Sequence, residues 1–147
     1  MNTASQIDTT VLIVGGGPVG MTMALCLAKR GIASYLVELR SAETLPDVKC
    51  NHISSRSMEL FRSLGISQDL RAAGLPDDYP HDVSYRTTTL GEEIARIHIP
   101  GRNTRLTDHS GPDGNWPTPE PPHRINQRYI EPILRRHVQK QTLITCL

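Results

Sequence analysis

The sequence is poor in cysteine and in aromatic residues, and it carries no marked excess of charge of either sign. Its 147 residues include only 3 Cys, and Phe, Trp and Tyr together make up 4%. Cys26, Cys50 and Cys146 stand far apart and form no Cys-x-x-Cys or Cys/His cluster, which excludes a disulfide framework and a structural zinc site. We therefore expect reduced, mostly buried thiols in a cytoplasmic protein that binds no metal.

The balance of charge bears on the partners of the protein. The 16 Lys and Arg residues are offset by 15 Asp and Glu residues, which leaves a formal net charge of +1. Binding along nucleic acid needs concentrated basic residues, and base stacking needs aromatic ones. The composition thus argues against nucleic acid as the main partner, and the length fits one modest globular domain.

The stretch from Thr9 to Ala28 contains no charged residue, but it is interrupted by Gly15, Gly16, Gly17 and Pro18. No Lys or Arg precedes it to form the basic start of a signal peptide. We therefore expect a buried strand, a turn and a buried helix here, and no membrane span.

The first forty residues predict a strand–helix–strand unit. Val11–Val14 is a short apolar run rich in β-branched residues, which is typical of a central parallel strand covered on both faces. Pro18 suits the first turn of a helix, which should run to about Arg30 before Gly31 stops it. Ala33–Leu39 predicts a second buried strand. The fold class is therefore α/β, with parallel strands joined by a crossover helix.

Further elements are expected along the rest of the chain. A helix from about Ser55 to Leu64 stops at Gly65, and a short helix opened by Ser67 ends at Gly74. A hairpin of Val83–Leu90 and Glu93–Ile99 follows. The last elements are a helix that begins no earlier than Gln127 or Arg128 and a third buried strand at Leu143–Leu147. The apolar faces expected of the two longer helices are Met58, Leu60, Phe61 and Leu64 in the first and Ile130, Ile133, Leu134 and Val138 in the second.

Pro100–His123 differs in kind, since it holds six of the 11 prolines and three glycines. Such a segment is a long loop, a linker or the border of an active site, where Trp116 either covers the site or packs the loop down. We expect residues 1–75 to hold the strand–helix–strand unit and the two helices, 76–123 the inserted hairpin and Pro/Gly-rich loop, and 124–147 the last helix and third strand.

The pattern Gly15-x-Gly17-x-x-Gly20 follows a predicted strand and opens a predicted helix, the context of a dinucleotide-binding fingerprint. Gly15 permits the tight turn, Gly17 leaves room for a pyrophosphate, and Gly20 lets the helix lie close to the sheet. The amide groups of about Val19 and Gly20, after Pro18, would bind phosphate oxygens at the start of the helix.

Glu38 stands eighteen residues after Gly20, near the end of the second predicted strand. A carboxylate in this place can accept hydrogen bonds from both hydroxyls of an adenosine ribose, and it would repel the 2′-phosphate of NADP. Arg40 nearby weakens that objection to NADP. The fingerprint by itself leaves NAD and FAD open.

Three blocks of the sequence resemble the flavin-dependent aromatic hydroxylases, the single-component FAD monooxygenases that include phenol and hydroxybenzoate hydroxylases. They are VLIVGGGPVGMTMALCLAKRGIASYLVELR (Val11–Arg40), PDVKCNHISSRSMELFRSLGI (Pro46–Ile66) and RINQRYIEPILRRH (Arg124–His137). The resemblance implies a Rossmann-like FAD-binding domain, of which these residues would be the N-terminal part, without the later segments and the substrate domain.

The resemblance also assigns roles to single residues. It makes Lys49 the basic residue that reaches the FAD phosphates or ring, where many relatives have Arg; the alternative is a solvated loop lysine. Gln127 would bind the phosphate–ribose region or cap its helix, and Arg40 would contact the adenine side or point into solvent. Arg56 would lie near the cofactor or pair with Glu59. No catalytic side chain is implied.

The activity implied is hydroxylation of a small aromatic, phenolic substrate, with NAD(P)H as transient reductant of FAD and with O2. Residues 1–147 alone are expected to be inactive, and self-association is left open. The alternatives are another FAD-dependent oxidoreductase, halogenase-like or oxidase-like, and a non-catalytic dinucleotide-binding module.

Overall fold

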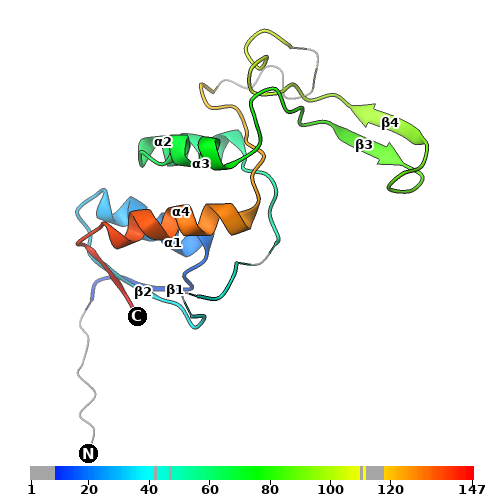
Figure 1. Cartoon of the computed structure of the whole chain (residues 1–147). Coiled ribbons are helices and arrows are strands. Elements are labelled where there is room, and N and C mark those ends of the chain that lie inside the picture. Colours follow the sequence, from blue (N-terminus) through cyan, green and yellow to red (C-terminus); the bar gives the residue numbers. More distant parts are fainter. Residues whose placement is uncertain (1–8, 42, 47, 110, 112–117) are drawn as a thin grey trace, which may run out of the picture. The chain divides into compact units, whose positions relative to one another are not determined.

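The computed structural model of the chain (Figure 1) describes residues 9–41, 43–46, 48–109, 111 and 118–147. These residues form two units. The first contains the described residues up to Lys49 together with Gln127–Leu147, and the second contains those of Cys50–Asn126. Trp116 lies outside the described residues, so its two alternative roles stay predictions.

The first unit contains a three-stranded parallel sheet in the order β1-β2-β5. Its strands are β1 (Leu12–Val14), β2 (Ser34–Val37) and β5 (Ile144–Cys146). Leu12 lies opposite Tyr35, and Tyr35 lies opposite Thr145. The predicted α/β class, the parallel strand–helix–strand start and the third strand are confirmed.

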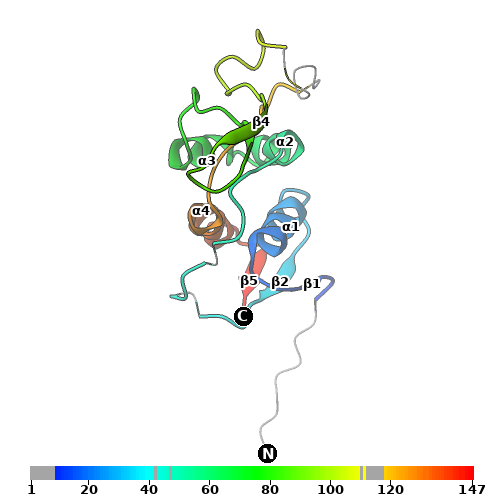
Figure 2. The same cartoon turned by 90° about the vertical axis from the view of Figure 1, so that its right-hand side faces the viewer.

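Two helices complete this unit, α1 (Pro18–Ala28) and α4 (Gln127–Gln139). They pack against each other on one side of the strands, as Figures 1 and 2 show. The predicted apolar face of α4 is buried throughout, at Ile130, Ile133, Leu134 and Val138. α4 begins at Gln127, as expected, and Pro132 is its sixth residue, so the carbonyl of Arg128 lacks its usual amide partner.

The burial predicted for the outer strands is wrong. β1 is an edge strand, and its Leu12 and Val14 side chains are 58% and 81% exposed. Thr145 and Cys146 of β5 are exposed too. Successive side chains of a strand point to opposite faces, and among the described residues of this unit the helices cover only one face of the sheet. All three thiols are free as expected, but none is fully buried.

The second unit contains two short helices, α2 (Ser55–Ser63) and α3 (Ser67–Ala73). Met58 and Phe61 of α2 are buried as predicted, whereas Leu60 is 40% exposed because it lies on another side of the helix. The side chain of Ser54 accepts a hydrogen bond from the Ser57 amide and caps α2. Ile66 rather than Ser67 occupies the cap position of α3.

The described end of the Pro/Gly-rich segment is fixed to α3 by Arg71. The buried Arg71 guanidinium donates to the carbonyl oxygens of Pro121 and Pro122 at 2.6 and 3.1 Å, and it pairs with Glu120 at 2.9 Å. Next along the chain, His123 exchanges backbone hydrogen bonds with Ile53. This end of the expected loop is therefore ordered by charge-assisted hydrogen bonds.

The predicted hairpin is present as β3 (Val83–Arg86) and β4 (Glu93–Ile97). The strands are antiparallel, with an irregularity between Tyr85 and Arg86. Every residue of both strands is exposed, so apolar burial contributes little to the hairpin.

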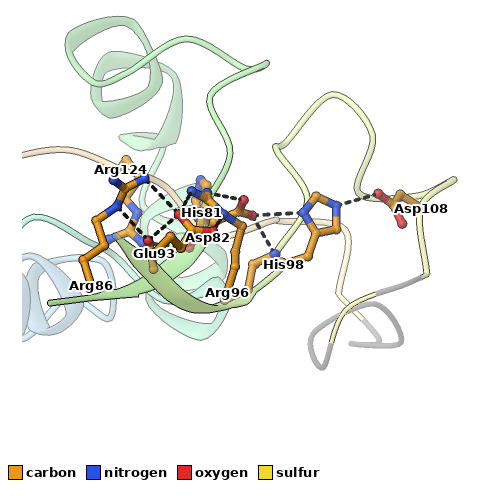
Figure 3. Close-up of polar contacts among 10 residues, drawn as sticks. His81, Asp82, Arg86, Glu93, Arg96, His98, Asp108 and Arg124 are labelled. Atoms are coloured by element: carbon orange, nitrogen blue, oxygen red, sulfur yellow. Dashed lines mark hydrogen bonds and ion pairs between the residues drawn. The ribbon is translucent and has the colours of Figure 1, made fainter. Parts of the chain in front are cut away.

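Ionic contacts connect the hairpin strands instead (Figure 3). Glu93 pairs with Arg86 at 2.9 Å and with Arg96 at 2.6 Å, and Arg96 also reaches Asp82 at 3.0 Å. Hydrogen bonds from Arg96 and then from Ser84 lower the pKa of Glu93 to about 2.

No helix among the described residues has the length and apolar character needed to cross a bilayer.

Gly20 brings α1 close to the end of β1. A Cβ at this position would fall well inside contact distance of the Gly15 carbonyl oxygen and 3.3 Å from the Ile13 side chain. On the same helix, Ala24 and Ala28 are buried, at 0% and 8% exposure. The helix therefore comes close to the strand end at Gly20.

We expect Gly20→Ala to destabilise the chain by about 3 kcal/mol or more, because the backbone oxygen of Gly15 cannot move aside as a flexible side chain could. The matched control is Gly17→Ala, whose Cβ would meet nothing within 4 Å and which should cost about 1 kcal/mol or less. Urea unfolding of both variants and the wild type measures this. Equal midpoints for the two variants would contradict the close approach.

The buried histidines of the second unit predict acid sensitivity. Burial, aided by the charge of Arg124, lowers the pKa of His81 to about 4, and burial lowers the pKa of His123 to about 4 although its Nε2 lies 2.9 Å from the Leu70 carbonyl oxygen. The ordinary pKa of histidine is near 6.5, so the unfolded chain binds more protons. The neutral rings of His81 and His123 therefore contribute fully to the stability of the fold above about pH 6.5. This contribution is lost as the pH falls from there to about 4.

NMR titration of the histidine ring resonances, with urea unfolding at pH 7 and pH 5, tests this expectation. The resonances of His81 and His123 should stay those of neutral rings at pH 5, where the free energy of unfolding should already be lower than at pH 7. Ring resonances that titrate near pH 6.5 in the folded chain would contradict it.

Candidate functional site

The glycine turn after β1 is shaped by two different requirements. Gly15 has a φ of +110°, a backbone conformation that residues other than glycine rarely adopt. Its amide donates a hydrogen bond to the Val37 carbonyl at 2.7 Å. Gly17 is the N-cap of α1 in an extended conformation, and no atom lies within 4 Å of where its Cβ would be. The turn is thus tight at Gly15 and open at Gly17.

The open side of the turn coincides with the start of α1. Pro18 is the first helical residue, and the Met21 amide makes the first intrahelical bond, to the Gly17 carbonyl at 3.0 Å. Helix geometry leaves the amides of Val19 and Gly20 without intrahelical acceptors. Val19 is 83% exposed, and the helix dipole favours an anion at this end of α1.

Glu38, which follows β2, is tied to this turn. Its Oε2 accepts a hydrogen bond from the Gly16 amide at 2.8 Å, and its Oε1 accepts one from the Arg40 amide at 2.9 Å. The Arg40 guanidinium makes two longer contacts, at 3.3 and 3.4 Å. The carboxylate predicted from spacing alone therefore lies beside the open glycine turn.

These contacts set the charge of Glu38. Hydrogen bonds from the Arg40 amide and then the Arg40 side chain, with a further one from the Gly16 amide, lower the pKa of Glu38 to about 2 although desolvation acts the other way. Glu38 is thus a charged acceptor over the whole physiological range of pH.

Gln127 and Arg40 meet at a third residue, Glu131. The Gln127 side-chain amide donates to Glu131 Oε1 at 2.7 Å, and Arg40 Nη2 lies 3.8 Å from Glu131 Oε2. The Glu131 side chain is 1% exposed, within the N-terminal half of α4. The loop after β2 and the first turn of α4 are therefore joined through one buried carboxylate.

Not every predicted site residue belongs to this group. Lys49 is exposed in the irregular segment after β2, and its cofactor contact stays a prediction. Arg56 pairs with Glu59 at 3.4 Å, one of its two proposed roles, with a side chain 87% exposed. Within the part of the chain that the structure describes, no group of three or more His, Cys, Asp or Glu side chains could hold a metal ion.

Two residues of the site were not among the predicted ones. Gly16 holds Glu38 through its amide, and a Cβ there would lie 2.8 Å from the Glu38 Cβ. Glu131 binds Gln127 from the position four residues later in the same helix, a spacing that places side chains on one face. That spacing could have identified Glu131, whereas the role of Gly16 depends on a partner from the next strand.

Together these groups can bind a ligand that has both an anionic part and neighbouring hydroxyls. The amides at the start of α1 suit phosphate oxygens, and the charged Glu38 suits hydroxyl donors.

The model of the FAD-binding domain family matches residues 8–146 of this chain. Among curated relatives, the FAD-dependent monooxygenase apdD of Emericella nidulans is 35% identical over 98% of the chain and 23% of the relative. The 2,4-dichlorophenol 6-monooxygenase of Cupriavidus pinatubonensis is 31% identical over 89% of the chain and 21% of the relative. The chain thus spans less than a quarter of the length of these relatives.

Solved structures give the same result. The rebeccamycin biosynthetic enzyme RebC with reduced flavin is 36% identical, with a TM-score of 0.77, over 97% of this chain and 26% of that one. The flavin-dependent monooxygenase PieE in complex with FAD and substrate is 31% identical, with a TM-score of 0.78, over 97% of this chain and 24% of that one. By sequence and by fold, the chain belongs to the FAD-binding-domain family found in flavoprotein monooxygenases.

Proposed function

We propose that these residues form the part of a flavoprotein monooxygenase that binds the adenosine and pyrophosphate of FAD, and that the whole protein hydroxylates an aromatic, phenolic substrate with NAD(P)H and O2. The observation that carries the proposal is the 2.8 Å hydrogen bond between the Gly16 amide and Glu38. It supports the proposal because it holds a charged carboxylate, to which ribose hydroxyls would donate, beside the open glycine turn.

The residues at the turn fit the pyrophosphate. Gly17 leaves the space beside the turn free of side-chain atoms, and the amides of Val19 and Gly20 supply donors for phosphate oxygens. Gly15 and Pro18 contribute shape, since the first permits the turn and the second starts the helix.

Glu38 fits the ribose, provided that Arg40 gives way. A carboxylate offers about four acceptor positions, and four N–H contacts from Gly16 and Arg40 already surround this one. The two amide contacts are fixed by the backbone, whereas the two side-chain contacts are longer. Ribose hydroxyls would therefore replace the Arg40 side chain on Glu38, which frees Arg40 for the adenine side.

The remaining roles rest on the resemblance to aromatic hydroxylases. Gln127 would bind the phosphate–ribose region, and Lys49 would reach the phosphates or the ring as a point charge. FAD would supply the redox and oxygen chemistry when bound, while these residues hold and orient it.

The class of substrate is supported by the names of relatives. Two of the relatives are a 2,4-dichlorophenol 6-monooxygenase and a phenol 2-monooxygenase from a Pseudomonas strain, and the chain covers 21% and 22% of their lengths. The second is 30% identical over 92% of the chain. Both act on phenols by name, which favours a phenolic substrate over the oxidase-like and halogenase-like alternatives. A substrate domain would be supplied by further residues of the whole protein.

We expect Gly17→Val to abolish FAD binding by the chain, because its side chain would occupy the space left for the pyrophosphate. The extended backbone at Gly17 accepts valine, so the thermal midpoint without FAD should change little. Flavin fluorescence during titration with FAD measures binding, and Ala33→Val, at an exposed position before β2, is the matched control.

An unchanged FAD affinity in Gly17→Val would refute the fingerprint. A wild-type chain that binds ADP but not FAD would favour a non-catalytic module. The FAD-loaded 147 residues are expected to show no NAD(P)H oxidation stimulated by phenol, since they span less than a quarter of the curated relatives.

Glu38→Gln should weaken FAD binding by roughly tenfold, because a neutral amide accepts hydroxyl hydrogen bonds less strongly than a carboxylate and has one oxygen fewer. Glu43→Gln, which removes an equal charge from the exposed segment after β2, should leave the affinity unchanged. Equilibrium dialysis with FAD at pH 7 compares the two variants. Equal losses in both would mean that only net charge matters.

A further inference from the structure

The buried carboxylate of Glu131 requires an explanation that the proposed contacts to FAD do not give. An ionised carboxylate is costly to bury unless hydrogen bonds and an opposite charge compensate. Glu131 has both, from Gln127 at 2.7 Å and from Arg40 at 3.8 Å. Its 1% exposure leaves little surface for direct contact with a ligand.

The two partners of Glu131 come from separate segments of the first unit. Arg40 follows β2, and Gln127 is the first residue of α4. Both are residues to which the proposed function gives a contact with FAD. The Glu131 side chain links them, since its Oε1 accepts a hydrogen bond from Gln127 and its Oε2 lies 3.8 Å from Arg40.

Arg40 also lies between two carboxylates. It contacts Glu38 at 3.3 Å and Glu131 at 3.8 Å, and its side chain is 37% exposed. If ribose hydroxyls take its place on Glu38, Glu131 is the second anion already within reach. Arg40 then keeps a charge partner in the same unit and is not released into solvent.

We propose that Glu131 is a positioning residue for the cofactor site: its buried carboxylate holds Gln127 and Arg40 in the orientations in which they meet FAD, and it retains Arg40 when the ribose binds Glu38. This inference rests on the proposed function, because it takes Gln127 and Arg40 as contacts of FAD. It adds a residue that contacts no ligand itself and acts through two others.

A double-mutant cycle on FAD affinity tests the proposal. Glu131→Gln keeps the size of the side chain and an acceptor for Gln127 but removes the charge that holds Arg40, so we expect roughly tenfold weaker FAD binding by the full chain. In an Arg40→Ala background the same change should cost less than about twofold, since the partner is already absent.

Leu134→Ala provides the matched control for a merely structural effect. Leu134 is fully buried in the same helix, so its truncation should lower the thermal midpoint. Its effect on FAD affinity should be the same with and without Arg40. Equal FAD losses for Glu131→Gln in the two backgrounds would overturn the proposal, because a packing defect would not depend on Arg40.

A second measurement needs no FAD. The side-chain amide resonances of Gln127 are followed by 15N NMR in the cofactor-free chain, where the bond to Glu131 should shift them and slow their exchange with water. In Glu131→Ala they should move to the values of a solvated glutamine. Resonances that do not change would overturn the role of Glu131, whereas a wild-type chain that keeps this bond but fails to bind FAD would count against the proposed function instead.

Discussion

The close approach of α1 to the end of β1 is the constraint on which the first unit depends. It exists because Gly20 has no side chain where the Gly15 carbonyl oxygen passes. The same approach orients the start of α1 beside the turn and allows β2 to pair with β1, so that Glu38 can reach the Gly16 amide. One steric requirement thus determines both the packing of the helix and the shape of the candidate site.

A second layer of organisation consists of carboxylates that receive N–H donors from distant segments. Glu38 joins the glycine turn to the end of β2, and Glu131 joins that end to α4. In the second unit, Glu120 plays a comparable part for Arg71. Charge-assisted hydrogen bonds are stronger than neutral ones, and they suit segments that contain too few apolar side chains to be held by burial.

Local patterns predicted most of the elements and the centre of the site. Backbone geometry at a strand–turn–helix junction requires glycine at fixed positions, here Gly15, Gly17 and Gly20, and it also fixes how many residues separate them from Glu38. Both features can be read in the sequence. Burial was predicted less well, since Leu12, Val14 and Leu60 are apolar residues whose exposure depends on what packs against their faces. The list of these three shows that an apolar pattern identifies an element but does not say which faces are covered.

The contacts that escaped prediction are those between different elements. Gly16 matters because Glu38 comes from the next strand, and Glu131 matters because Arg40 comes from the loop after it. Pairings of this kind depend on the tertiary fold, and no spacing within one segment contains them.

The order of the described strands has a consequence for the behaviour of the chain in solution. β1 and β5 are both edges, so each presents backbone amides and carbonyls on the side away from β2. Such edges are templates for pairing with another chain, and the apolar side chains of Leu12 and Val14 beside one of them add to the attraction. These two margins are therefore the places where a further strand, from this chain or from another, would add to the sheet, a process separate from the stability of either unit.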